Sequence, residues 1–160
     1  MHSRFSQLVL ATALIFVCHA LAQSQDANAP TKPKVKVYLT GVGPDAQFAT
    51  IIDGLTDFLV EKKVAAHPME GESKSRTASI DRLSTLGATS LLYITLDIAA
   101  GQVKDTLLVQ CFDASGKLLW EEKAKGGLFA TSASGVAKGM LKAIKKKLEP
   151  HIGKDGLPVD

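Results

Sequence analysis

The sequence predicts a single α+β domain with a mixed sheet, in the order β-α-β-α-β-β-β-α, whose helices pack on one face of the sheet. Two patterns predict this fold. An early strand–helix–strand segment is typical of a parallel crossover, and three closely spaced strands before an amphipathic helix are typical of an antiparallel meander. A chain of 160 residues fits one domain, because domains usually contain about 100–200 residues.

Composition excludes several classes of protein. The chain is 46% hydrophobic and 22% charged, which is too apolar for an intrinsically disordered protein. Its 19 Lys+Arg and 16 Asp+Glu give a net charge of +3, which is too small to indicate nucleic-acid binding by itself. Its 2 cysteines cannot build a disulfide framework.

Residues 1–22 have the pattern of a secretory signal peptide. Arg4 is the only charged side chain before Asp26, the run Leu8–Val17 is apolar with one exception, and Ala20–Ala22 supplies small residues for cleavage before Gln23. We therefore expect export, and a periplasmic or extracellular location after cleavage near Ala22. The alternative is an uncleaved anchor, for which the apolar run is short against the roughly 20 residues of a membrane span.

The rest of the chain divides into three parts. Residues 23–33 are small and polar with two prolines and predict a flexible leader. Residues 34–153 form the α+β domain, and residues 154–160 predict a frayed tail. Cys18 leaves with the signal peptide, so Cys111 cannot pair within its own chain and is expected to be buried as a small hydrophobe.

The first half of the domain alternates between strands and helices. Val35–Leu39 alternates in polarity and predicts a strand. Pro44 suits the first turn of a helix over Asp45–Lys62, whose apolar residues recur every three or four positions. Val64–Met69 contains a proline and predicts an edge strand or the end of one. After a polar loop, a short helix capped by Ser79 carries leucines on one side and ends at a glycine.

The second half predicts a meander and a closing helix. The strands are Ser90–Ile98, Val103–Phe112 and Lys117–Lys125. The turn Asp113–Gly116 between the last two is typical of a type I turn with a left-handed glycine. The last helix starts at Ser132 or at the serine two residues later, and ends at a proline.

No pattern of residues indicates a catalytic, cofactor or metal site. His67 and His151 lack further ligands at metal-binding spacing. The segment Gly41–Pro44 lies where phosphate loops lie, but it matches neither glycine-rich signature and its proline removes an N–H donor, so it predicts a turn. Glu121 and Glu122 point to opposite faces of a strand and cannot act as an acid–base pair.

The strongest charge feature is a row of lysines on the last helix: Lys138, Lys142, Lys145 and Lys146. These side chains are candidates for contact with an acidic partner or with anionic lipid head groups. The alternative is a solvated helix face, because amphipathic surface helices often carry such residues. Aromatic residues do not alternate with the lysines, so the row does not favour binding of single-stranded nucleic acid.

Several segments resemble a known group of bacterial envelope domains. Val35–Leu39, Ile51–Leu55 and Leu86–Ile94 resemble the N-terminal domain of the periplasmic protein TolB and the related assembly domains of CsgG and of the lipoprotein activators of penicillin-binding proteins. Trp120 and the helix through Leu148 continue the resemblance, which spans roughly residues 34–150. The chain departs from these families because it has no following β-propeller, acylated cysteine or pore-forming hairpin, so the resemblance implies a fold more than a role.

We therefore expect an exported, non-enzymatic binding or assembly module of the bacterial cell envelope, without cofactors, whose partner is another envelope protein. The alternative is a secreted enzyme or enzyme inhibitor with a small pocket near the first strand–helix loop, collecting His67, Tyr93 or Asp97.

Overall fold

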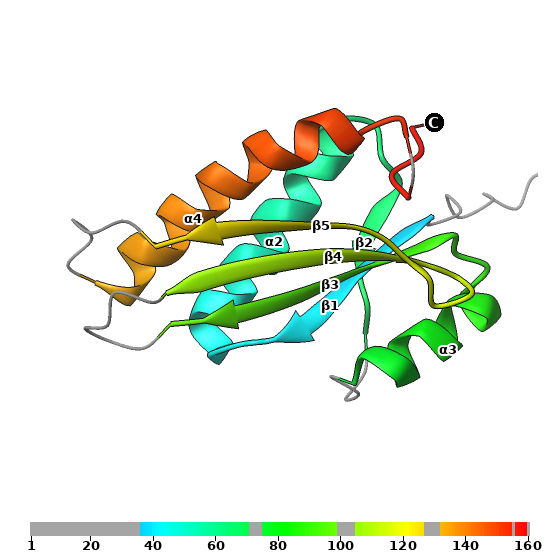
Figure 1. Ribbon diagram of the computed structural model, residues 1–160, viewed down its shortest axis with the longest axis horizontal. Helices are drawn as coiled ribbons and strands as arrows, with labels where there is room; N and C mark the ends of the chain where they lie inside the picture. The colour runs from blue at the N-terminus through cyan, green and yellow to red at the C-terminus, as the bar shows by residue number, and fades with distance from the viewer. Residues whose placement is uncertain (1–35, 71–74, 99–104, 127–131, 155, 160) are drawn as a thin grey trace, which may run out of the picture. The chain divides into compact units, whose positions relative to one another are not determined.

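The computed structural model of the chain describes residues 36–70, 75–98, 105–126, 132–154 and 156–159 (Figure 1). The predicted signal peptide and leader lie outside these residues. Within the described ranges, no helix combines the length and the apolar character that a membrane span requires.

Five strands form one mixed sheet in the order β2-β1-β3-β4-β5. Strand β1 pairs in parallel with β2 and β3, whereas β3, β4 and β5 pair as antiparallel neighbours. This topology confirms the predicted parallel crossover followed by a meander. The strands are β1 (Val37–Val42), β2 (Ala66–Pro68), β3 (Ser90–Asp97), β4 (Thr106–Asp113) and β5 (Leu118–Lys125).

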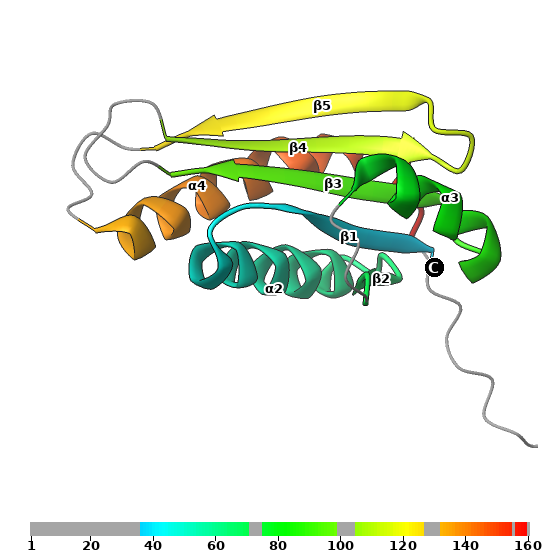
Figure 2. The same ribbon diagram turned by 90° about the horizontal axis from the view of Figure 1, so that it is seen from below.

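The helices are α2 (Asp45–Glu61), α3 (Arg76–Leu86), α4 (Ala133–Leu148) and the short 3-10 turn η1 (Glu149–His151). Helices α2 and α4 share the main core with one face of the sheet, as predicted. Helix α3 differs, because Leu83 packs with Leu91 and Phe112, which alternate along their strands with residues of the main core. Figures 1 and 2 show α3 apart from the α2–α4 pair.

The cap predicted for α3 is wrong, whereas one of the two caps predicted for α4 is confirmed. Ser79 does not cap α3 but lies inside it, buried, and its hydroxyl donates a hydrogen bond of 2.8 Å to the carbonyl of Ser75. Ser132 is the cap of α4, because its hydroxyl accepts a hydrogen bond of 3.2 Å from the backbone N–H of Gly135.

The hairpin turn between β4 and β5 has the predicted form. Gly116 adopts a left-handed φ of 83°. One carboxylate oxygen of Asp113 accepts hydrogen bonds from the Ser115 hydroxyl (2.6 Å) and from the backbone N–H groups of Ser115 (2.9 Å) and Lys117 (3.0 Å). These bonds, the Ser115 hydroxyl first, hold the pKa of the Asp113 carboxyl below its usual value, so the turn is most stable with this carboxyl ionised.

Gly41 lies within β1, and close packing against β3 explains why a glycine stands there. A Cβ atom on Gly41 would lie 1.8 Å from the carbonyl oxygen of Ile94 in the neighbouring strand. Only glycine allows this approach of β1 to β3. Gly41 and Val42 therefore continue β1, so the turn predicted over Gly41–Pro44 is wrong for these two residues.

The end of the chain differs from the predicted frayed tail. Leu157 is fully buried in the main core, and the backbone N–H of Gly153 donates a 2.8 Å hydrogen bond to its carbonyl. Val159 forms an antiparallel bridge with Val64. A single buried leucine in a short irregular segment has no periodicity, so the pattern of the sequence does not reveal this contact.

We predict that Leu157→Ala lowers the free energy of unfolding by about 2–5 kcal/mol, because it leaves a cavity among packed side chains. Urea denaturation measures this change. Val159→Ala is the control, since Val159 is 45% exposed and its truncation should cost less than about 0.5 kcal/mol. Equal effects of the two substitutions would contradict the buried tail.

Cys111 is fully buried in the main core, as the sequence predicts. Burial, with a smaller contribution from the charge of Asp113, raises the pKa of its thiol from 9.0 to about 12. The native state therefore keeps the proton at a pH where the unfolded state loses it. Stability from this group is complete below pH 9 and is lost as the pH rises toward 12.

We predict that Ellman's reagent does not react with Cys111 in the native protein at pH 8 and reacts promptly in denaturant, because the thiolate is the nucleophile. Urea denaturation between pH 8 and 10 should show a fall in stability that Cys111→Ala lessens. A native thiol that reacts as fast as the unfolded one would overturn this assignment.

Candidate functional site: a basic groove between α2 and α4

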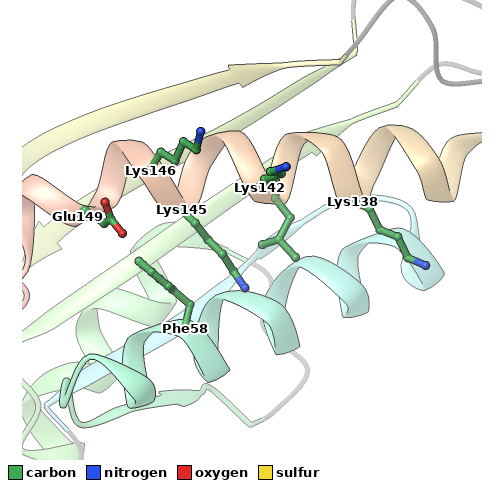
Figure 3. Close-up of a pocket in the computed structure, with 7 residues that line it drawn as sticks. Phe58, Lys138, Lys142, Lys145, Lys146 and Glu149 are labelled. Carbon is green, nitrogen blue, oxygen red and sulfur yellow. The ribbon is translucent and has the colours of Figure 1, made fainter.

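The four lysines singled out in the sequence line one hollow between α2 and α4. This hollow, here called the basic groove, has a volume of about 390 Å³. Figure 3 shows Lys138 and Lys145 extending from α4 toward α2, with Phe58 rising from α2 beside Lys145. Its lining residues are Phe58, Lys138, Leu141, Lys142, Lys145, Lys146 and Glu149.

The groove exists because α2 and α4 pack closely at one point. A Cβ atom on Gly54 would lie 2.4 Å from Cδ2 of Leu141, so the missing side chain of α2 makes room for a leucine of α4. The opposite side of helix α4 is apolar and buried against the sheet. Its buried residues are Val136, Ala137, Met140, Ile144 and Leu148. Its lysines are therefore left on the side that borders α2 and solvent.

One aromatic ring organises the end of the groove. Phe58 is 7% exposed. The ammonium groups of Lys145 and Lys62 lie 5.6 Å and 5.9 Å from the centroid of its ring, within the range of cation–π attraction. Lys62 also lies 3.8 Å from the carboxylate of Glu149, a pair that is half exposed and contributes little stability.

The positive charge of the four groove lysines is not neutralised by carboxylates of the described residues. Among the described residues, no carboxylate forms an ion pair with Lys138, Lys142, Lys145 or Lys146. Like charges three or four residues apart destabilise a helix by about 0.2–0.5 kcal/mol per pair. The negative end of the helix dipole offsets this for Lys145 and Lys146, but Lys138 is too near the start of α4 to benefit. The groove therefore concentrates positive charge that is available to an anionic partner.

A second polar cluster was not predicted from the sequence. The rings of Trp120 and His151 stack with their centroids 4.2 Å apart. Glu122 lies 3.4 Å from His151 and 3.5 Å from Lys147. The contacts join β5 to the end of α4 across about 30 residues of sequence, a separation at which no spacing motif applies, and they anchor the end of α4 beside the sheet.

A second hollow, of about 490 Å³, lies between α3 and the β4–β5 hairpin, where Arg76 stands 5.3 Å from the ring centroid of Phe112. Neither hollow is lined by the first strand–helix loop. The register places His67 beside Tyr38 of β1, and Tyr38 lies beside Leu91 of β3 on its other side. Asp97 lies six residues beyond Leu91, about 20 Å further along β3. His67 and Asp97 are therefore not brought together.

Comparisons with known proteins give little further information. No family model matches the chain, and no curated protein matches it. A solved structure of the PelC dodecamer from Paraburkholderia phytofirmans aligns with a TM-score of 0.49 at 16% identity, covering 78% of this chain and 92% of that chain. A variant of the same PelC dodecamer aligns with a TM-score of 0.49 at 15% identity, covering 84% and 96%.

We predict that Gly54→Val lowers the free energy of unfolding by roughly 1–3 kcal/mol, because its side chain collides with Leu141. The double variant Gly54→Val, Leu141→Ala should recover part of this loss, since the smaller residue frees the space. A double-mutant cycle measured by urea denaturation tests the contact. Strictly additive effects would show that the two residues do not touch.

Proposed function

We propose that the chain is an exported, non-enzymatic binding module of the bacterial cell envelope, and that it docks through the basic groove onto an acidic protein surface. The carrying observation is that four lysines without ion-pair partners among the described residues border one hollow. The pattern of a secretory signal peptide in residues 1–22 supports export.

The chemistry of the groove favours a partner with several negative charges. Its cations are all lysines, which act as hydrated point charges on flexible stems, whereas arginine offers a planar fork for one bidentate carboxylate or phosphate. Binding of this kind depends on the sum of several charges and weakens with salt.

An acidic protein surface fits the groove better than an anionic membrane. The lysines border a concave hollow, and the ring of Phe58 in its lining is only 7% exposed. A membrane-bound amphipathic helix instead presents an apolar face that enters the lipid, and the apolar face of α4 is buried against the sheet.

A fluorescein-labelled peptide of ten glutamates provides a simple acidic probe. We predict that the protein binds this peptide at low ionic strength, and that Lys142→Glu with Lys145→Glu weakens binding roughly tenfold or more, because each close charge pair contributes on the order of 1 kcal/mol. Fluorescence anisotropy measures the affinity. The protein is purified after export, and its first residue is expected to be Gln23.

The matched control reverses two lysines elsewhere, in Lys123→Glu with Lys125→Glu on β5, which changes the net charge equally. This control should retain most of the affinity of the unchanged protein. Equal losses in both double variants would mean that only net charge matters. Tighter binding to vesicles of anionic lipid than to the peptide would favour the membrane instead.

A further inference from the structure

The surface formed by α2 and α4 carries two strips of opposite charge. The basic strip consists of the four groove lysines. The acidic strip consists of Asp53, Asp57 and Glu61 on α2, all of them exposed. Among the residues that the structure describes, no member of one strip forms an ion pair with a member of the other. A single copy of the chain therefore leaves both strips unsatisfied.

The two helices run in the same direction and in register. Gly54 meets Leu141 near the middle of the helices, Phe58 meets Lys145 one turn later, and Lys62 meets Glu149 at the end. The same sequence offset separates the partners in all three contacts. Each residue of α2 can therefore be matched with the residue of α4 that lies at the same position along the helix axis, which we call its height.

The charges repeat with the same period on both helices. Asp53, Asp57 and Glu61 follow one another at four-residue intervals, as do Lys138, Lys142 and Lys146. Four residues of α-helix rise about 6 Å. By the offset between the helices, Asp57 is level with Ile144 and thus lies between the heights of Lys142 and Lys146. Asp53 likewise lies between the heights of Lys138 and Lys142.

A two-fold axis along the groove, parallel to both helices, makes this pattern self-complementary. Rotation about such an axis keeps each residue at its height and places α2 of one copy over α4 of the other. Each acidic strip then faces the basic strip of the other copy, with carboxylates between pairs of ammonium groups. Contacts of this kind, in which one patch meets itself, are the commonest interfaces of homodimers.

We infer that the occupant of this face is a second copy of the chain, bound as a symmetric dimer through the acidic strip on α2 and the basic strip on α4. The inference rests on the proposed docking role of the basic groove and names its acidic partner. Leu141 lies beside the axis, so its apolar side chain meets the same residue of the other copy.

The expected dimer is weak and sensitive to salt. A helix of 17 residues such as α2 is about 25 Å long, and two packed helices present a face about 20 Å wide. The resulting area, of order 500 Å² per copy, is below the roughly 800 Å² per partner of a typical stable interface. Its attraction is mainly between exposed charges, which salt screens within about 8 Å at physiological ionic strength.

Reciprocal charge reversal tests the proposal by sedimentation velocity at low ionic strength. One variant carries Lys138→Glu, Lys142→Glu and Lys146→Glu, and the other carries Asp53→Lys, Asp57→Lys and Glu61→Lys. We expect the unchanged protein to dimerise, and each variant alone to dimerise roughly tenfold more weakly or not at all, because like charges then face each other. An equimolar mixture of the two variants should form a heterodimer.

The control replaces the first variant by Lys123→Glu, Lys125→Glu and Lys154→Glu, which has the same net charge but reverses lysines outside the groove. By itself this control should dimerise like the unchanged protein, because both of its strips are intact. Mixing it with the second variant should add no dimer beyond that. Circular dichroism confirms that every variant is folded. A monomeric unchanged protein, or a monomeric mixture of the two groove variants, overturns the dimer.

The acidic peptide separates the two proposals. If the groove binds the peptide while the protein stays monomeric, the self-association is wrong and the docking role stands. If neither the peptide nor a second copy binds, the docking role fails as well.

Discussion

The contact between Gly54 and Leu141 is the constraint on which the charged surface of this domain depends. Because the glycine has no side chain, α4 approaches α2 closely enough for its leucine to lie across the neighbouring helix. Two further contacts along the pair follow at the same offset: the ring of Phe58 beside Lys145 and the ion pair of Lys62 with Glu149. The basic groove is the surface consequence of this packing.

The surroundings of the groove keep it in place without neutralising it. The apolar side of α4 is committed to the main core, and its end is tied to β5 through the stacked rings of Trp120 and His151. The carboxylate of Glu122 pairs with Lys147 and His151, which lie outside the lining of the groove. Glu122 therefore pairs with cations outside the groove, and the four groove lysines remain available to a partner.

Most of the fold could be predicted from local patterns, and the exceptions have physical reasons. The element order, the hairpin turn at Gly116 and the burial of Cys111 agree with expectation. The sequence did not predict that helix α3 lies apart from the other helices. Residues on both faces of β3 are apolar, so alternation alone does not show which face a helix covers. The burial of Leu157 depends on one contact in an irregular segment.

The sequence by itself determined which residues of α4 are buried and which lysines remain outside, because a period of 3.6 residues separates the two sides of a helix. Only the tertiary structure decided that these lysines border a hollow with Phe58 and share a surface with the acidic residues of α2. Residues of α2 and α4 are far apart in the chain, and their relative height is set by how two helices pack on a sheet, which no local period encodes.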